Sequence, residues 1–185
     1  MPKNMIVIMG GQGSGKGTQA AILRENHNYN YIETGAIFRG LPTDSEIAKL
    51  IARGELVPDE KLFPLVSGKI AAGGDADVLF DGFPRTLPQA KWLYDFARQD
   101  YKMTVIYFDL PEKVMIERIN NRLKTGGGRA DDSDMAAVRK RLNSFQTKTM
   151  PAIKFFQNAT GIRFLDIDAT GTVEQIAKEI KARLR

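Results

Sequence analysis

A glycine-rich segment constrains this chain more than any other feature of its sequence. Residues 10–18 read GGQGSGKGT, after a short apolar run at residues 5–9 and before a stretch of helical character at residues 19–25. A strand, a glycine-rich loop and a helix in that order form the setting of a phosphate-binding loop. Glycines let the backbone turn its N–H groups towards phosphate oxygens, and the helix start adds its own unpaired N–H groups. The segment therefore predicts a site for a phosphorylated ligand.

Two side chains of this segment carry its chemistry. Lys16 supplies a full positive charge for the outer phosphates of a ligand, and Thr18 supplies a hydroxyl for a phosphate or a magnesium ion. The strict consensus has serine or threonine directly after the lysine, whereas Gly17 intervenes here. A flexible glycine loop with a solvated lysine is the alternative interpretation, and the flanking strand and helix argue against it.

Length, charge and composition narrow the function classes. The chain has 185 residues, which suits a single domain over residues 1–185, and no apolar run approaches the roughly 20 residues that cross a bilayer. It has no cysteine and one histidine, His27, so disulfides, cysteine-bound zinc and multi-histidine sites are excluded and a cytoplasmic location is expected. The net charge of +5 favours anionic partners, and without a basic–aromatic pattern we expect phosphorylated small molecules rather than nucleic acid.

Predicted strands alternate with predicted helices along the whole chain. We expect strands near residues 5–9, 28–32, 78–80, 104–108 and 163–167, with a long helical stretch from residue 135 that is kinked near Pro151. This alternation is typical of an α/β fold with a parallel sheet covered by helices on both faces. Ligands of such sheets bind at the carboxyl ends of the strands, where the glycine-rich segment, the Thr34 turn and the Asp81 loop should meet.

Several motifs occur together in one order. They are residues 10–19 (GGQGSGKGTQ), Thr34-Gly35 with Arg39, residues 54–60 (GELVPDE), residues 81–89 (DGFPRTLPQ), residues 117–122 (ERINNR) and residues 129–142. In this order the chain resembles an adenylate kinase, a nucleoside monophosphate kinase, in its short-lid form. The resemblance implies a three-layer P-loop NTPase fold with a five-stranded parallel sheet. It also implies two small insertions, an AMP-binding segment at residues 34–63 and a short lid at residues 124–132.

The resemblance also implies an activity and a set of residues. The activity is reversible, magnesium-dependent transfer of the ATP γ-phosphoryl group to AMP, giving two ADP, by a monomer without zinc. The implied catalytic residues are Lys16, Arg85, Arg122, Arg129 and Arg141. The implied ATP-binding residues are Gly13, Ser14, Gly15, Lys16, Gly17, Thr18, Arg118 and Arg122. The implied AMP-binding residues are Thr34, Gly35, Arg39, Val57, Gly82, Arg85, Gln89, Arg129 and Arg141. Cationic side chains suit this reaction because its transition state is anionic and needs little covalent help.

Carboxylates near the expected phosphate site have two interpretations. Asp81 ends a buried strand and is expected, with Thr18, on the magnesium side of the site, with contact through water. The alternative for Asp81 is a simple turn residue, because turns favour aspartate. Asp131 and Asp132 either orient the closing arginines or cap the following helix.

The acceptor base is expected to be read by Gln89, because an amide accepts from one adenine edge group and donates to its neighbour. Thr86 stands where UMP/CMP kinases usually carry asparagine, which favours AMP. Two features differ from the family pattern: Ala36 replaces the usual aspartate, and residues 40–45 form a shorter segment. A kinase for UMP or CMP is therefore the alternative, followed by a non-catalytic nucleotide-binding switch. A GTPase is weakly supported because the chain lacks an Asn-Lys-x-Asp segment.

Overall fold

A parallel β-sheet forms the centre of the protein. The structure, a computed structural model, describes residues 2–25, 27–52, 57–124 and 135–184. The strands are β1 (Lys3–Gly10), β2 (Asn30–Glu33), β3 (Val78–Asp81), β4 (Tyr101–Asp109) and β5 (Arg163–Asp168). They form one five-stranded sheet in the order β2-β3-β1-β4-β5, and every neighbouring pair is parallel. The predicted α/β fold and its five-stranded parallel sheet are confirmed.

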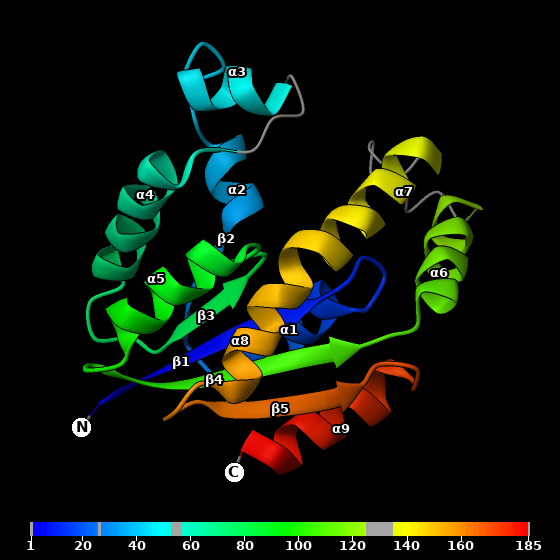
Figure 1. The fold of residues 1–185 in the computed structure, drawn as a ribbon. Helices are drawn as coiled ribbons and strands as arrows, with labels where there is room; N and C mark the ends of the chain where they lie inside the picture. The colour runs from blue at the N-terminus through cyan, green and yellow to red at the C-terminus, as the bar shows by residue number, and fades with distance from the viewer. Residues whose placement is uncertain (1, 26, 53–56, 125–134, 185) are drawn as a thin grey trace.

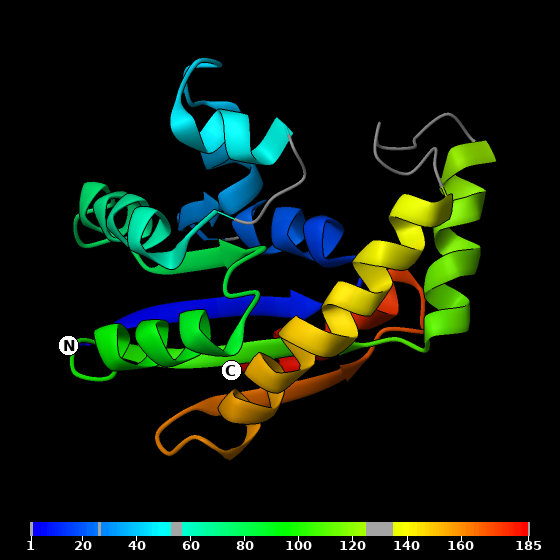
Figure 2. The same cartoon turned by 45° about the horizontal axis from the view of Figure 1, so that its top comes forward.

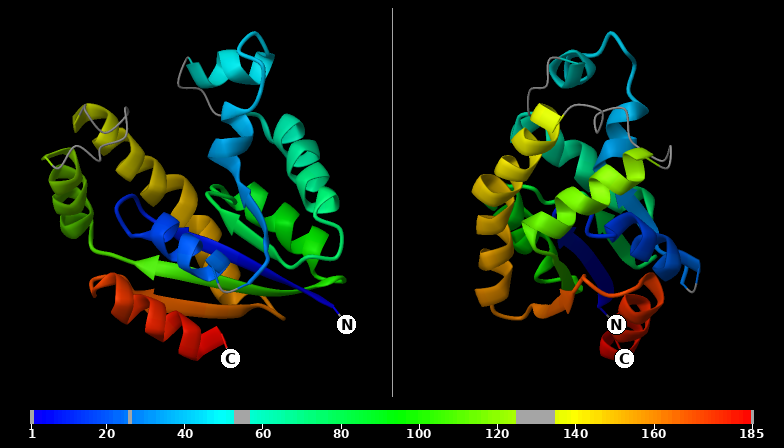
Figure 3. Two further views of the ribbon diagram at one scale, coloured as in Figure 1. Left: turned by 180° about the vertical axis from the view of Figure 1, so that it is seen from behind. Right: turned by 90° about the vertical axis from the view of Figure 1, so that its right-hand side faces the viewer.

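Helices cover both faces of this sheet. The described helices are α1 (Lys16–Glu25), α2 (Thr34–Arg39), α3 (Glu46–Ala52), α4 (Asp59–Ala72), α5 (Leu87–Ala97), α6 (Glu112–Lys124), α7 (Met135–Ser144), α8 (Met150–Asn158) and α9 (Val173–Leu184). Helices α5 and α8 pack together over one face, and α1 and α9 pack over the other (Figure 1, and from behind in Figure 3). Within the described residues, no helix is both long and apolar enough to cross a membrane.

The central strands owe their position to their apolar sequences. All five residues from Met5 to Met9 in β1 are buried, as are Val78, Leu79 and Phe80 in β3. Because helices cover both faces of a parallel sheet, its strands read as continuous apolar runs rather than alternating ones. Each fully buried side chain of this size contributes about 1.5–3 kcal/mol through the hydrophobic effect. The apolar run before the glycine-rich loop therefore fixes that loop at the middle of the sheet.

Two groups of helices extend beyond the carboxyl ends of the strands. Helices α2 and α3 rise on one side and α6 and α7 on the other (Figures 1 and 2). The expected AMP-binding segment, residues 34–63, corresponds to α2, α3 and the start of α4, with residues 53–56 outside the described residues. The expected lid, residues 124–132, lies outside the described residues except for Lys124.

A π-helical turn stands at the place where a kink was predicted near Pro151. This turn, η2 (Phe145–Thr149), joins α7 to α8 without a break. Pro151 lies in the first turn of α8 and has no N–H to donate to the preceding turn. The wider turn in front of the proline accommodates this missing hydrogen bond. The result is one long helical rod whose lower half, α8, packs on α5 (Figure 2).

A polar cluster ties the amino ends of the strands together. The carboxylate of Asp77 accepts hydrogen bonds from the backbone N–H of Asn4 at 2.7 Å and from its side-chain amide at 2.9 Å. The Nε2 atom of His27 lies 2.9 Å from Oδ2 of the same carboxylate. Burial alone would raise the pKa of Asp77, but these hydrogen bonds lower it below its usual value. His27 thus lies at the edge of the sheet opposite the glycine-rich loop.

We predict that Asp77→Asn lowers the thermal midpoint at pH 7. A carboxyl group whose pKa is lowered on folding stabilises the folded state above its unfolded pKa, and this contribution is lost as the pH falls through the folded pKa. The difference between wild type and Asp77→Asn should therefore narrow once the pH falls below about 4. Thermal melts from pH 7 to pH 3 measure this difference, with Asp75→Asn as the control. If the difference in thermal midpoint between wild type and Asp77→Asn stays constant from pH 7 to pH 3, the stabilising role of the Asp77 carboxylate is contradicted.

Candidate active site

A cavity of about 690 Å³ opens at the carboxyl ends of β1, β2 and β3. The register places these ends side by side, because Ile8 in β1 and Glu33 in β2 both pair with Asp81 in β3. Basic side chains dominate the charged part of its lining: they are Lys16, Arg85, Arg118, Arg122 and Arg141, against the carboxylates Glu33 and Asp81. A cleft with this balance of charge attracts a polyanionic ligand. The glycine-rich segment, the Thr34 turn and the Asp81 loop therefore meet as expected.

The glycines of the loop are required by its backbone conformation. Gly13 and Gly15 have φ angles of +78° and +88°, in the left-handed region that other residues rarely adopt. A Cβ atom on Gly13 would also lie only 3.1 Å from the carbonyl oxygen of Met115 in α6. The loop can therefore follow its path against α6 only with glycine at this position. Gly13, Gly15 and Gly17 all line the cavity, and their expected phosphate contacts stay predictions.

Lys16 lies over the loop itself. Its ammonium group donates to the carbonyl oxygens of Gly10 and Gly11 at 2.7 and 2.6 Å, and to the hydroxyl oxygen of Ser14 at 3.3 Å. Ser14 is fully buried, and its hydroxyl donates to the Gly11 carbonyl at 2.8 Å. The Ser14 side chain therefore supports the loop from within, while the lysine brings a positive charge to the place where phosphates are expected. Thr18, two residues further along α1, also lines the cavity.

Asp81 is oriented by a tyrosine that sequence reasoning missed. The hydroxyl of Tyr31 in β2 donates to Oδ2 of Asp81 at 3.2 Å. Burial, together with the charges of Asp81 and Glu33, raises the pKa of Tyr31, so its hydroxyl stays protonated and able to donate at neutral pH. The guanidinium of Arg24 lies 4.3 Å from the centre of the tyrosine ring, which holds the ring from its other side. Tyr31 could have been identified from its position, because it lies two residues before the end of β2, the strand that pairs with β3.

The donor set around Asp81 fits a magnesium ion. Asp81 and Thr18 both line the cavity, and a Cβ atom on Gly17 would lie 3.9 Å from Oδ2 of Asp81. The carboxylate therefore lies beside the start of α1, where phosphate oxygens are expected. Magnesium prefers oxygen donors and is usually held by one or two carboxylates, water and substrate phosphates. Among the described residues there is no cluster of three or more acidic or histidine side chains that would form a complete protein cage.

Glu33 is a second carboxylate in the cavity lining that the sequence reasoning did not consider. It stands directly before Thr34-Gly35 and is the register neighbour of Asp81 across β2 and β3. Its position at the carboxyl end of a predicted strand was the signal that could have identified it. Ala36, where a carboxylate is usual, lies exposed in α2 and outside the cavity lining. The negative charge near this turn is therefore carried by Glu33.

The loop after β3 positions Arg85 through its own backbone. Gly82 has a φ of +81°, and its carbonyl oxygen accepts hydrogen bonds from Nε of Arg85 at 2.8 Å and from the hydroxyl of Thr34 at 3.0 Å. On the other side, the hydroxyl of Thr149 in η2 donates to the carbonyl oxygen of Arg85 at 2.9 Å. Arg85 is thus held by the Gly82 carbonyl, which Thr34 at the start of α2 also contacts, and by Thr149 of the helical rod. Gly35, Gly82 and Arg85 line the cavity, and Thr34 is buried behind it.

Gln89 and Val57 are outside the cavity lining. Gln89 is only 7% exposed, and its amide bonds to the backbone N–H of Arg85 and to Asp59. Val57 is buried in the core between α3 and α4. Their expected contacts with an acceptor base therefore stay predictions. The hydrogen bond to Asp59 was not foreseen, since the two residues are far apart in the sequence.

Arg118 ties α6 to two loops at once. Its guanidinium donates to the carbonyl oxygen of Gly13 at 3.4 Å and to those of Thr170 and Gly171 at 3.2 and 3.5 Å. It lies where the glycine-rich loop meets the turn between β5 and α9. Arg122 and Arg141 line the cavity from α6 and α7. Arg118, Arg122 and Arg141 therefore lie together at the cavity, and their expected roles stay predictions.

Some expected site residues lie beyond what the structure describes. Arg129, Asp131 and Asp132 fall in residues 125–134, outside the described residues, and the side chain of Arg39 is likewise not described. Their roles stay predictions.

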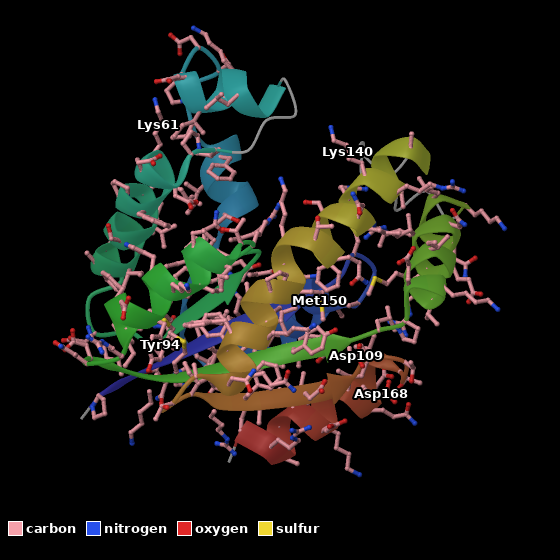
Figure 4. The ribbon with its side chains drawn as sticks, viewed as in Figure 1. Lys61, Tyr94, Asp109, Lys140, Met150 and Asp168 are labelled. Atoms are coloured by element: carbon pink, nitrogen blue, oxygen red, sulfur yellow. The ribbon has the colours of Figure 1, made fainter. Side chains whose placement is uncertain are left out.

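Asp109 and Asp168, side by side at the ends of β4 and β5 (Figure 4), are outside the cavity lining. The carboxylate of Asp168 accepts from the backbone N–H of Thr170 at 2.9 Å, and this hydrogen bond lowers its pKa. It therefore has a turn-forming role.

Comparison with known proteins gives one consistent result. The family model described as adenylate kinase matches residues 8–161. A protein of Flavobacterium johnsoniae named adenylate kinase is 36% identical over 183 residues, covering 95% of both chains. Proteins with the same name from Flavobacterium psychrophilum and from Synechococcus sp. WH7803 are each 34% identical, covering 95% and 98% of this chain and 95% and 99% of their own.

We predict that Gly13→Ala weakens binding of inorganic tripolyphosphate in the cavity at least about tenfold, because a strained left-handed residue costs about 1–3 kcal/mol. The measurement is the rise in thermal midpoint with added tripolyphosphate. Gly68→Ala is the matched control: Gly68 is exposed in α4 with open space around it, so binding should be unchanged and stability should rise by up to about 1 kcal/mol. Equal binding by wild type and Gly13→Ala would contradict the assignment of the loop.

Proposed function

Because the chain belongs to the adenylate kinase family, we propose that its cavity transfers the γ-phosphoryl group of magnesium-bound ATP reversibly to AMP, giving two ADP. The main support for this proposal is that two side chains suited to binding phosphate line the same cavity. They are Lys16 on the glycine-rich loop and Arg85 on the loop after β3. A donor and an acceptor can therefore meet without leaving the protein. Nothing in the comparisons favours a kinase for UMP or CMP.

The ATP site is proposed on the side of α1 and α6. The backbone of the glycine-rich loop and Lys16 bind the β- and γ-phosphates, with Thr18 beside them. Arg118 lies against the loop at Gly13, where its planar guanidinium can lie over the adenine ring. Arg122 reaches the phosphates from the same helix. The full proposed set is Gly13, Ser14, Gly15, Lys16, Gly17, Thr18, Arg118 and Arg122.

The AMP site is proposed on the side of β2, β3 and α2. Arg85 binds the acceptor phosphate, and its fixed backbone sets the direction from which that phosphate attacks. Gln89 reads the base, with Thr34 and Val57 around it. The full proposed set is Thr34, Gly35, Arg39, Val57, Gly82, Arg85, Gln89, Arg129 and Arg141.

The proposed chemistry is an in-line displacement. A phosphate oxygen of AMP forms a bond to the γ-phosphorus while the bond to the β–γ bridging oxygen breaks, and that oxygen leaves as the terminal oxygen of ADP. Negative charge spreads over the transferring group in the transition state. Lys16, Arg85, Arg122, Arg129 and Arg141 are proposed to stabilise it. Arginine's planar group can grip two phosphate oxygens at once.

Magnesium is the proposed cofactor, and Thr18 and Asp81 are the residues proposed to hold it, Asp81 through water. When bound, magnesium neutralises charge on the β- and γ-phosphates. Tyr31 keeps the Asp81 carboxylate turned towards the start of α1. The expected absence of zinc is retained as part of the proposal, as are the monomeric state, the cytoplasmic location and the absence of nucleic acid or membrane partners. Sedimentation equilibrium tests the monomer.

The test of the function is phosphoryl transfer from magnesium-bound ATP to AMP, UMP, CMP, GMP and dAMP in parallel. The proposal expects AMP to give the highest kcat/KM. A clear preference for UMP or CMP would overturn AMP as the acceptor while leaving the ATP site in place, and it would direct attention to Ala36. If no acceptor is phosphorylated, the proposal that the protein is a nucleoside monophosphate kinase is overturned.

We predict that Lys16→Ala lowers kcat at least about 100-fold, because the lysine charge is needed most where charge develops in the transition state. The measurement is ADP formation by the folded variant, with circular dichroism to confirm folding. Lys91→Ala, which removes an exposed lysine from α5, should keep the wild-type rate. Near-normal kcat in folded Lys16→Ala would refute the role of the loop.

We predict that Gln89→Ala raises the KM for AMP about tenfold or more and leaves the KM for ATP within about twofold of wild type. A lost hydrogen bond to a polar ligand group costs about 1 kcal/mol or more, and here two are lost. Steady-state kinetics with each substrate varied in turn measure the difference. Gln157→Ala, at an exposed position of α8, is the control. Equal changes in the two KM values would refute a role confined to the acceptor.

A further inference from the structure

The side-chain amide of Gln89 is held at both of its ends. Its Oε1 atom accepts a hydrogen bond from the backbone N–H of Arg85 at 2.8 Å. Its Nε2 atom donates to Oδ1 of Asp59 at 2.9 Å. Gln89 lies in the first turn of α5 and Asp59 is the first residue of α4, so the contact joins two helix starts. With 7% of its surface exposed, Gln89 has little room to move.

The two partners leave the amide only one orientation. A backbone N–H can only donate, so the atom that faces it must be the amide oxygen. A carboxylate can only accept, so the atom that faces Asp59 must be the NH₂ group. Reversing the amide would set two donors against each other at Arg85 and two acceptors against each other at Asp59. Both contacts are partly buried, so each reversed pair would leave polar groups without a partner and would destabilise that orientation.

The orientation determines what the amide can still bind. One lone pair of Oε1 and one N–H of Nε2 are left for a ligand. Adenine presents an exocyclic N–H donor beside a ring-nitrogen acceptor, which matches this pair. A 6-oxopurine presents an oxygen acceptor beside a ring N–H donor, which is the reverse. The amide as held therefore favours a 6-aminopurine, whereas a reversed amide would favour a 6-oxopurine.

We infer that Asp59 is a specificity-determining positioning residue: by fixing the Gln89 amide, it makes the acceptor site select 6-aminopurine over 6-oxopurine monophosphates. The inference rests on the proposed function, in which Gln89 reads the acceptor base. Asp59 acts only through Gln89. The start of α5 does not depend on it, because the hydroxyl of Thr86 caps that helix by accepting from the backbone N–H of Gln89.

The test compares kcat/KM for AMP and for IMP, which differ at this edge of the base. Wild type should prefer AMP. Asp59→Ala should lower the AMP/IMP ratio about tenfold or more, because a hydrogen bond to a charged group is stronger than one between neutral groups. Asp59→Asn keeps an oxygen that can accept from the amide and should restore the ratio to within about threefold of wild type. The KM for ATP should stay unchanged in both variants.

Two controls separate positioning from a structural effect. Glu60→Ala removes the other acidic side chain from the first turn of α4 and should leave the ratio unchanged. In a Gln89→Ala background, adding Asp59→Ala should cause no further change in the ratio. Asp59→Ser, whose shorter side chain withdraws the oxygen from the amide, takes the place of Asp59→Ala if that variant does not fold.

The outcomes distinguish the inference from the function beneath it. If wild type does not phosphorylate AMP, both the proposed function and the inference about Asp59 are overturned. If wild type is active with AMP but Asp59→Ala keeps the wild-type AMP/IMP ratio, only the inference is overturned. The same holds if Glu60→Ala lowers the ratio equally, or if Asp59→Ala changes the ratio further in the Gln89→Ala background.

Discussion

Backbone carbonyl oxygens hold three cations of the active site in place. The ammonium of Lys16 bonds to the Gly10 and Gly11 carbonyls, the Arg85 guanidinium to that of Gly82, and Arg118 to those of Gly13 and the turn after β5. A carbonyl is a neutral partner, so it orients a cation without neutralising it. Phosphate oxygens make stronger, charge-assisted hydrogen bonds and can take the carbonyls' place.

The sheet register makes this arrangement possible. Asp81 in β3 pairs with Ile8 in β1 on one side and with Glu33 in β2 on the other, so three loops begin at one level. The loop after β3 is also held from both sides: Thr34, at the start of α2, donates to the Gly82 carbonyl, and Thr149, in the π-helical turn, donates to the Arg85 carbonyl. The turn that accommodates Pro151 thereby also links the rod carrying Arg141 to the arginine proposed to bind the acceptor phosphate. The two proposed nucleotide sites thus share one framework.

How far the sequence predicts this protein depends on the range of each interaction. The glycine-rich loop and the five strands were predictable because they depend on local backbone demands and on continuous apolar runs. The rule that ligands bind at strand carboxyl ends placed Lys16, Asp81 and Arg85 together correctly. The hydrogen bonds of Tyr31 to Asp81 and of Asp59 to Gln89 were not predictable, because each joins residues far apart in the chain whose meeting depends on packing. A kink was predicted near Pro151, but the π-helical turn before this proline was not predicted.

The central claim is that donor and acceptor sites face each other across a single cavity. Calorimetric titration with a bisubstrate ligand, two adenosines joined by a chain of phosphates, tests it most directly. The account predicts that one ligand binds per protein, that it competes with both ATP and AMP, and that Lys16→Ala and Arg85→Ala each weaken it. Binding of two ligands per protein, or competition with only one of the nucleotides, would contradict it.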